Sequence, residues 1–300
     1  MKYRIKRYED NDFIRVRDFL SESYGKCGTN WRIERWNFAF SLSSEMHEGL
    51  EQLKNSIGIF EDDNGRIISV VNSEGEMLGE VFFQLTGEYR SEKLLNDMFE
   101  FAEANATLMT DEGKLLRVFI PGSDKELIKI AMERRYVKTS AIDNTTAITG
   151  NVNAAKSMPD GFTFTTGDKL GPDKKALAHA KAFGYIDSEI YLNRAEIGFR
   201  KLMEMPDYRA DLDVIIIDSN GEPASFASMW YDSRNHIAML EPMGTLPDYR
   251  RMGLGSLALH EGIRRCQNLG AKKSYGGDQR FYYDIGFKVE FTYEIWKKIL

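Results

Sequence analysis

Between residues 241 and 256 the sequence passes from a strand pattern into a helix pattern through a turn that holds two glycines, Gly253 and Gly255. Both fall where the first N–H groups of the helix lack intrahelical partners, so a polyanion can approach the backbone directly. The helix end adds about 0.3–1 kcal/mol of attraction per negative charge. The stretch therefore predicts a phosphate-binding turn, although a helix with a solvated cationic face and a glycine-rich lead-in fits the same residues.

The charges around this turn differ from those of the whole chain, whose net charge is −6. Residues 249–273 contain one acid, Glu261, and six basic residues, which are Arg250, Arg251, Arg264, Arg265, Lys272 and Lys273. The acidity belongs to residues 1–150, with 20 basic and 26 acidic side chains, since residues 151–300 carry 20 of each. Nucleic-acid binding rests on neutralising phosphates. We therefore expect no nucleic-acid partner.

Two other phosphate-binding motifs can be compared with the same turn. Residues 253–258 match the letters of the dinucleotide fingerprint G-x-G-x-x-A. That fingerprint belongs directly after the first strand of a series of βα units, whereas only 42 residues follow Ala258 here. The turn is not a P-loop either, because it lacks the Gly-Lys-Ser/Thr sequence with which that motif ends. Nicotinamide-dependent oxidoreduction is therefore disfavoured.

The length of 300 residues predicts two domains, and the composition is that of an ordinary globular protein. Cys27 and Cys266 are too few and too far apart for a disulfide framework or a thiolate metal site, so we expect a reducing cytoplasm and no metal. No apolar run approaches the roughly 20 residues of a membrane span. We expect neither export nor membrane insertion, and the sequence leaves the oligomeric state open.

Hydrophobic period and turn residues predict an antiparallel meander followed by alternating helices and strands in the second half. The predicted strands are 162–165, 212–218, 224–231, 237–245, 272–275 and 287–299, and the predicted helices are 174–183, 195–203, 252–269 and 278–285. Gly270 is the expected C-cap of the helix 252–269.

The first half repeats this order with different residues. Its predicted strands are 3–8, 57–60, 67–71, 77–85, 115–120 and 137–149, and its helices are 13–21, 92–103 and 125–134. Asp63-Asn64-Gly65 is a strong hairpin signal within its meander. The period near 150 predicts one architecture used twice, with domains at 1–150 and 151–300 and a linker at 150–160.

The second half contains two motifs that together are specific to one protein family. They are Arg250-x-x-Gly253-x-Gly255 after a strand, and Phe281-Tyr282-x-x-x-Gly286-Phe287 about 30 residues later. In this order they resemble the GNAT superfamily of N-acetyltransferases. The resemblance implies an α/β (α+β) fold of two tandem GNAT-like domains, each a mixed, mostly antiparallel twisted sheet flanked by helices. The first half resembles a degenerate copy, and the second a catalytic domain that binds acetyl-CoA.

The resemblance also implies which residues hold acetyl-CoA. Backbone groups of one strand end would hold the pantetheine arm, Arg250 fills the family's Arg/Gln position, and N–H groups of the turn would cradle the pyrophosphate. The implied cofactor-binding residues are Met243, Gly244, Thr245, Arg250, Arg251, Met252, Gly253, Leu254, Gly255 and Ser256. The chain departs from the family pattern at Tyr275, where an Asn is often found, and at Asp278, where a small residue is often found.

Tyr282 is the candidate general acid. Acyl transfer from a thioester expels a thiolate whose conjugate acid has a pKa near ~8.5, and a phenol with a pKa near ~10 is protonated at neutral pH. A core aromatic on a short helix is the other explanation of this residue. Tyr283 is the alternative acid.

Glu241 is the candidate general base, because it lies on the strand that should line the acyl site and an amine must lose a proton before it attacks. A strand-end carboxylate satisfied by its neighbours explains it equally well. A backbone N–H near Met243 is the expected donor to the oxyanion. His236 and His260 fit exposed or packed positions better than a catalytic role, and Cys266 fits the core.

The predicted activity is transfer of an acetyl group to a primary amine of a small molecule or peptide by direct attack. Residues 184–189 and 230–232 combine aromatic and acidic side chains that would suit a cationic amine, but ordinary loop composition explains them as well. A catalytically silent acyl-CoA-binding or regulatory module is the alternative function.

The first half lacks the residues of both motifs. The turn equivalent to 250–256 reads Tyr89-Arg90-Ser91-Glu92-Lys93 without either glycine. Aligning Phe287 with Tyr136 places Ala131 opposite Tyr282. We therefore expect the first half to bind no CoA and to shape the acceptor pocket or an interdomain surface.

Overall fold

The computed structural model of this protein describes residues 2–25, 28–75, 79–150 and 157–300. Cys27, the start of the strand predicted at 77–85 and most of the predicted linker lie outside the described residues. The chain forms two compact units. Unit 1 comprises Met1–Trp36, Gly49–Thr145 and Val289–Leu300, and unit 2 comprises Asn37–Glu48 and Thr146–Lys288. These units do not follow a single cut at residue 150.

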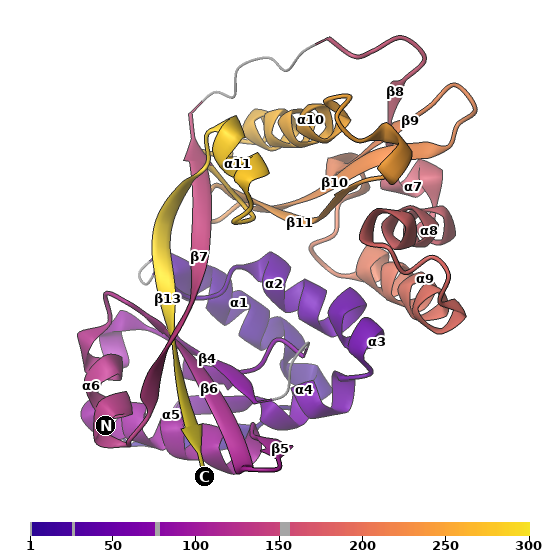
Figure 1. Ribbon diagram of the computed structural model, residues 1–300. Coiled ribbons are helices and arrows are strands. Elements are labelled where there is room, and N and C mark those ends of the chain that lie inside the picture. Colours follow the sequence, from indigo (N-terminus) through magenta and orange to yellow (C-terminus); the bar gives the residue numbers. More distant parts are fainter. Residues whose placement is uncertain (1, 26–27, 76–78, 151–156) are drawn as a thin grey trace. The chain divides into compact units, whose positions relative to one another are not determined.

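Unit 1 contains most of the elements of the first half, in the predicted order (Figure 1). They are β1 (Tyr3–Arg7), η1 (Asp10–Asp12), α1 (Phe13–Tyr24), α2 (Ile33–Phe38), α4 (Leu50–Ser56), β2 (Gly58–Asp62), β3 (Ile67–Asn72), β4 (Glu80–Leu85), η3 (Gly87–Tyr89), α5 (Glu92–Asn105), β5 (Leu108–Thr110), β6 (Gly113–Pro121), α6 (Lys125–Glu133) and β7 (Val137–Thr149). Helix α2 continues into unit 2 after Trp36. The helical turns between residues 33 and 56 are additions that the hydrophobic pattern does not predict.

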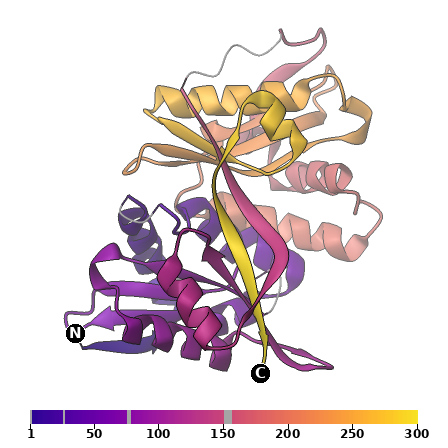
Figure 2. The ribbon, with the colours of Figure 1, turned by 60° about the vertical axis from the view of Figure 1, so that its left-hand side comes forward.

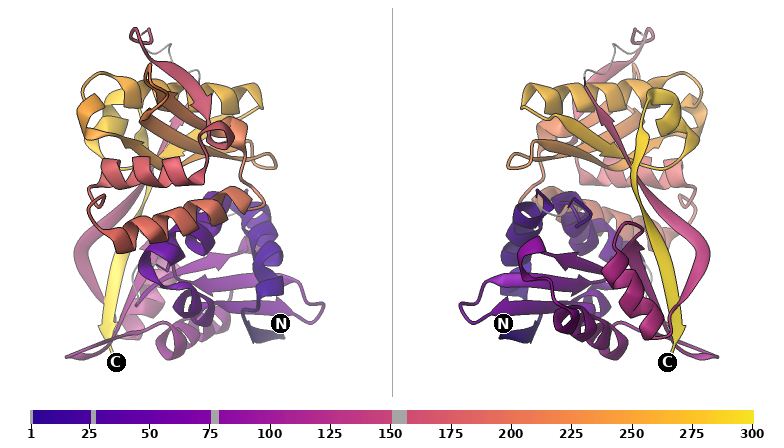
Figure 3. Two further views of the ribbon diagram at one scale, coloured as in Figure 1. Left: turned by 90° about the vertical axis from the view of Figure 1, so that its right-hand side faces the viewer. Right: turned by 90° about the vertical axis from the view of Figure 1, so that its left-hand side faces the viewer.

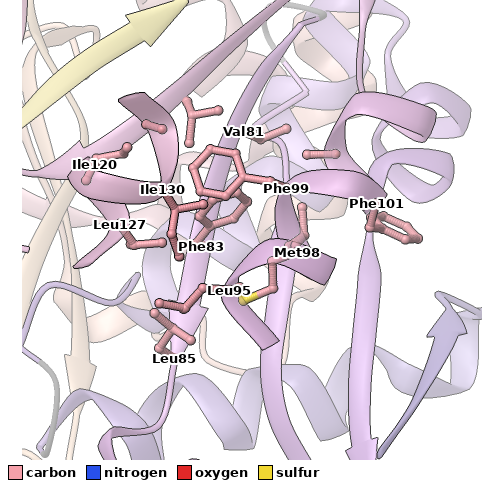
Figure 4. Close-up of a cluster of buried hydrophobic side chains, with 14 of the residues drawn as sticks. Val81, Phe83, Leu85, Leu95, Met98, Phe99, Phe101, Ile120, Leu127 and Ile130 are labelled. Carbon is pink, nitrogen blue, oxygen red and sulfur yellow. The ribbon is translucent and has the colours of Figure 1, made fainter. Parts of the chain in front are cut away.

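The sheet of unit 1 has the order β1-β2-β3-β4-β6-β13-β7, with β5 paired to β6. Strand β4 runs parallel to β6, and β6 runs antiparallel to β13 (Lys288–Ile299) from Tyr293 opposite Pro121 to Ile299 opposite Leu115. Apolar side chains of the strands, such as Phe83, pack against Phe99 of α5 and Leu127 of α6 (Figure 4). Trp296 of β13 belongs to the same cluster. The last strand of the chain is therefore part of the core of unit 1.

Unit 2 contains the elements of the second half before β13 in the predicted order, together with two short helical segments of the first half. They are η2 (Ala39–Ser43), α3 (Ser44–His47), β8 (Thr163–Thr166), α7 (Gly167–Leu170), α8 (Pro172–Phe183), α9 (Glu189–Glu204), η4 (Ala210–Leu212), β9 (Asp213–Ile217), β10 (Pro223–Asp232), β11 (Ile237–Thr245), η5 (Pro247–Tyr249), α10 (Leu254–Asn268), β12 (Lys273–Gly276) and α11 (Arg280–Ile285). The predicted mixed, mostly antiparallel sheet flanked by helices is confirmed.

The sheet of unit 2 has the order β7-β12-β11-β10-β9-β8 and separates two layers of helices. Val214 and Ile216 of β9 share a buried cluster with Leu257 of α10, whereas Ile215 shares one with Ala178 of α8. The alternation follows from the two-residue period of a strand. Figure 3 shows α8 and α9 on the face opposite α10. Full burial of each large apolar side chain contributes about 1.5–3 kcal/mol.

Two strands pass between the units along the chain. Strand β7 begins in unit 1, and its residues 146–149 belong to unit 2, where they pair with β12. Strand β13 begins at Lys288 of unit 2 and then pairs with β6 of unit 1. The two strands are neighbours in the strand order and run side by side in Figure 2. Each half of the sequence thus supplies a strand segment to the other half's sheet.

One hairpin occurs in both units with the same hydrogen bonds. The backbone N–H of Gly65 donates to Asp62 O, and that of Gly221 donates to Asp218 O, both at 3.0 Å. The Asp62 and Asp218 carboxylates each accept two backbone N–H groups of their own turn at 2.9 Å. Both glycines have a left-handed φ, 77° and 78°. The hairpin signal at Asp63-Asn64-Gly65 is confirmed, and its equivalent closes β9 and β10.

The ends of α6 and α11 also match. The N–H of Tyr136 donates to Ala131 O at 2.9 Å, and the N–H of Phe287 donates to Tyr282 O at 3.0 Å. The residue before each aromatic, Arg135 or Gly286, has a left-handed φ. Ala131 and Tyr282 therefore occupy matching positions, as the alignment of the two halves predicts.

Candidate active site

The sheet of unit 2 opens between β11 and β12. The two strands pair in parallel from Ile237 opposite Lys273 to Met239 opposite Tyr275. Strand β11 then continues to Thr245 along β10, whereas β12 ends at Gly276. In the residues that the structure describes, β12 therefore pairs with β11 only as far as Met239.

A bulge shapes β11 at the start of this opening. Ala227 pairs with Met243 and Met229 with Leu240, so Glu241 and Pro242 together face Ser228 alone. The peptide bond between Glu241 and Pro242 is cis. The buried indole N–H of Trp230 donates to Glu241 O at 2.7 Å. A bulge changes the direction in which the side chains of its strand point. In this bulge the carbonyl of Glu241 is held in place by the indole N–H of Trp230.

Three segments distant in sequence converge at the opening. The hydroxyl of Tyr282 in α11 lies 3.8 Å from Sδ of Met243 in β11. A Cβ on Gly255 of α10 would lie 2.9 Å from Thr245 Oγ1, 3.3 Å from Met243 Cε and 3.7 Å from the ring of Phe281. The predicted strand end, turn and tyrosine are thus brought together, and only glycine fits at position 255.

Tyr282 has a packed ring and a strongly perturbed phenol. Its ring lies edge-to-face with that of Phe287 at a centroid distance of 5.6 Å. Burial, together with the charge of Glu241, raises the pKa of Tyr282 to about 12. The phenol is therefore a proton donor throughout the neutral range.

Tyr283 faces a different environment. Its hydroxyl donates to the carboxylate of Asp278, which raises the pKa of Tyr283, and its side chain is 39% exposed. Of the two tyrosines, Tyr282 is the one that reaches β11. Glu241, on that strand, is half-buried and close enough to Tyr282 to act on its ionisation.

The turn before α10 presents its backbone as the sequence predicts. Arg251 and Gly253 have left-handed φ values of 69° and 86°, and the first helical N–H to find a partner is that of Leu257, which donates to Gly253 O at 3.0 Å. The N-cap Gly253 has no side chain to cap the N–H groups of residues 254–256, and a Cβ there would meet nothing within 4 Å. An anion has open access to this helix end.

The residues around this turn differ in their contacts and in their burial. The guanidinium of Arg250 donates to Thr245 O at 3.2 Å and to Ala182 O at 2.8 Å, so it joins the end of β11 to the last turn of α8. Leu254 is buried in the core and Met252 is 44% exposed. Gly244 is required by packing, because a Cβ would lie 2.6 Å from the ring of Phe226. Ser256 is half-buried on α10.

The basic patch predicted over residues 249–273 is divided in the structure. Arg264 and Arg265 both pair with Glu261, about 15 Å along the helix from its start at a rise of 1.5 Å per residue. Lys272 and Lys273 follow the other end of α10. Arg250 and Arg251 are the members of the patch that lie at the glycine turn.

The segments predicted to admit an acceptor are largely committed to structural contacts. Tyr185 contacts Nδ1 of His179 at 2.5 Å through its hydroxyl, and Ser188 caps α9. Asp232 accepts two N–H groups of its own turn, and the hydroxyl of Tyr231 donates to Leu269 O. Trp230 contributes to the site through its hydrogen bond to the backbone carbonyl of Glu241.

A buried polar cluster behind the bulge was not predicted. Lys175 of α8 is fully buried and pairs with the carboxylate of Asp213, and it donates to Ser228 Oγ at 2.8 Å. Ser228 and Tyr208 each donate to Asp213 at 2.8 Å. The signal in the sequence was the position of Lys175 at helical spacing with Ala178 and His179, on the apolar side of α8.

His179 lies next to this cluster and makes acid stability testable. Burial, together with the nearby charge of Lys175, lowers the pKa of His179 to about 3. An unfolded histidine titrates near ~6.5, so this contribution to stability is complete above pH ~6.5 and is lost as the pH falls towards about 3, by about 1.4 kcal/mol per pH unit. In urea unfolding at several pH values, His179→Phe should flatten this part of the dependence of stability on pH. Equal slopes in wild type and His179→Phe would contradict the prediction.

The second half of the chain is similar to a known protein family. Residues 175–287 match the family described as Acetyltransferase (GNAT) family. No curated protein matches the sequence. Among the described residues, no helix is both long enough and apolar enough to cross a bilayer.

Three solved structures are similar over nearly the whole chain. A tandem GNAT protein from the clavulanic acid biosynthesis pathway has a TM-score of 0.62 at 11% identity, with 99% of this chain and 98% of that chain covered. A GCN5-related N-acetyltransferase from Sphaerobacter thermophilus has 0.55 at 14%, with 99% and 95% covered. A GNAT-family acetyltransferase from Colwellia psychrerythraea has 0.55 at 10%, with 99% and 100% covered. These structures share the fold, and the chain contains an acetyltransferase domain of the GNAT family within residues 175–287.

Proposed function

We propose that this protein transfers an acetyl group from acetyl-CoA to a primary amine of a small molecule or peptide. The observation that carries the proposal is the approach of Tyr282 to Met243, 3.8 Å across the opening of the sheet. It would bring a protonated phenol next to the part of β11 beyond its described pairing with β12 and close to the start of α10, where Gly253 has no side chain to cap the helix. An acid, a base and an anion site thus meet in one place.

The residues present fit acetyl-CoA. The N–H groups of residues 251–256 would hold the pyrophosphate at a helix end that is open in front of Gly253. The edge of β11 from Met243 to Thr245 would bind the pantetheine arm as a neighbouring strand does, because its backbone groups lack β12 as a partner. Arg250 would hold this edge in place through Thr245 O. When bound, acetyl-CoA supplies the reactive thioester.

The proton transfers would divide between two residues. Glu241 accepts a proton from the incoming ammonium, directly or through water, so that the neutral amine can attack. Tyr282 gives its proton to the departing sulfur, because its raised pKa keeps the phenol protonated in the neutral range. The N–H of Met243 is the proposed donor to the oxyanion.

Unit 1 is proposed to bind no CoA. The N terminus of its helix α5 is capped by Ser91, whose Oγ accepts from Leu94 N. Arg90 is held in ion pairs with Asp124 and Glu126. Ala131 stands where unit 2 has the acid. These contacts support the proposal of a degenerate domain within 1–150 beside a catalytic domain within 151–300.

The proposal is tested first by calorimetric titration with acetyl-CoA. Gly253→Asp places a negative charge where the pyrophosphate would bind, so we expect at least a tenfold weaker Kd, corresponding to about 1.4 kcal/mol. Gly65→Asp is the matched control, since Gly65 also has a left-handed φ of 77° and open space before its Cβ. It should bind acetyl-CoA as wild type does.

The outcomes separate the candidate functions. No binding by folded wild-type protein would overturn the proposal altogether. Binding that Gly253→Asp does not weaken would place the cofactor elsewhere. Tight binding without acetyl transfer to any amine of a broad panel would favour the alternative, an acyl-CoA-binding module without catalysis.

A further inference from the structure

The C-terminal end of β7 lies directly behind the helix that carries Tyr282. Residues 146–149 of β7 pair antiparallel with β12, and the last pair joins Thr146 to Gly276. Thr146 is fully buried. Its hydroxyl donates to Gly277 O at 2.8 Å, with Gly276 O at 3.2 Å. One side chain therefore holds the backbone where β12 ends and the chain turns towards α11.

This backbone is the surface on which the ring of Tyr282 lies. A Cβ on Gly277 would lie 2.5 Å from Tyr282 Cε2 and 3.0 Å from Cζ, and one on Gly276 would lie 3.1 Å from Cδ1. The two glycines thus leave no free space between main chain and ring. A shift of Gly277 moves the surface that sets the position of the phenol.

A second contact ties β7 to the other end of the same helix. Gly286 ends α11 with φ 117°, and a Cβ there would lie 3.5 Å from Cδ1 of Ile148. Strand β7 therefore bonds to the chain just before α11, and Ile148 lies close to the residue that ends this helix. Hydrogen bonds at one end and packing at the other define where this short helix lies.

We propose that Thr146 is a positioning residue for Tyr282, which it holds in reach of β11 through the backbone of Gly276 and Gly277. The inference rests on the proposed function, in which Tyr282 protonates the leaving thiolate. Catalytic geometry is sensitive to displacements of about 1 Å. A hydroxyl that fixes the main chain under the ring therefore affects kcat more than the binding of acetyl-CoA.

The kinetic test compares three variants of β7 with an amine that wild type acetylates. Thr146→Val keeps the shape but removes the donor, and we expect kcat to fall about tenfold with KM for acetyl-CoA within about twofold. Thr146→Ser keeps a hydroxyl and should restore kcat to within about twofold of wild type. Thr149→Val makes the same change at an exposed position of the strand and should have no effect.

A double-mutant cycle with Tyr282→Phe distinguishes positioning from general damage. If Thr146 acts through the phenol, Thr146→Val should change kcat by less than about twofold once the phenol is absent. An unchanged tenfold loss in the Tyr282→Phe background would overturn the inference, as would wild-type kcat in Thr146→Val.

A second measurement needs no activity. In protein labelled with [ζ-13C]tyrosine, the Tyr282 resonance is identified by its absence from Tyr282→Phe. Thr146→Val should shift it, whereas Thr146→Ser and Thr149→Val should not. An unshifted resonance refutes positioning by Thr146 even if the protein is an active acetyltransferase, and a shift in a protein that binds no acetyl-CoA leaves the contact correct and the proposed function wrong.

Discussion

Replacing Tyr282 with phenylalanine is expected to lower kcat by about 10²–10⁴-fold, the usual contribution of a general acid. The ring of Phe keeps the packing against Gly277 and Phe287, so only the proton donor is lost. Because binding of acetyl-CoA relies on other residues, its Kd should stay within about threefold of wild type. Turnover is measured as release of the free thiol of CoA with a panel of primary amines, and the Kd by calorimetry.

Tyr283→Phe is the matched control for this experiment. It removes a hydroxyl from the neighbouring position of the same helix, where it contacts Asp278 and faces solvent. Its kcat should stay near that of wild type. Equal losses in both variants would point to a structural effect on α11, and wild-type turnover in Tyr282→Phe would exclude Tyr282 as the acid.

Lys175→Met is expected to reduce the free energy of unfolding by about 3–5 kcal/mol. The substitution leaves the carboxylate of Asp213, which is 1% exposed, without its cation. Methionine replaces most of the volume of lysine, so the loss comes from the unpaired charge rather than from a cavity. Urea unfolding followed by far-ultraviolet circular dichroism measures the change.

Two further variants identify the cause. Lys174→Met removes a charge that pairs with Glu222 at the surface, and it should cost no more than about 1 kcal/mol. The double variant Lys175→Met, Asp213→Asn removes both charges and should recover part of the loss. If the double variant is as unstable as Lys175→Met, the unpaired carboxylate is not the reason for the instability.

The elements that the sequence predicts well have a local signal. Strand β11 has the bounds 237–245 that hydrophobic alternation and its flanking turn predict. The helix predicted at 252–269 begins two residues later, because Arg251 and Gly253 take left-handed conformations before Leu254. Such a start is decided by backbone angles that the hydrophobic period does not encode.

The arrangement of the site depended on contacts that no local pattern contains. The spacing of Gly255 and Tyr282 indicated a family, but not that Thr245, Met243 and Phe281 surround Gly255. The strand predicted at 287–299 forms and is β13. Its alternation of apolar and polar residues, however, would fit the edge of any half-buried sheet. Its pairing with β6 in unit 1 therefore could not be predicted from its own residues.

The crossing of β13 sets the order in which the protein can fold during synthesis. Residues 146–288 separate Thr145 from the last segment of unit 1, and at about 5–20 residues per second a ribosome needs about 7–29 s to make these 143 residues. Until Trp296 emerges, the apolar cluster of unit 1 lacks one of its members and β6 lacks a strand at one edge. Unpaired strand edges invite association with other chains. The first domain to be translated is thus the one that waits longest for completion, and through that interval the edge of β6 is open to such association.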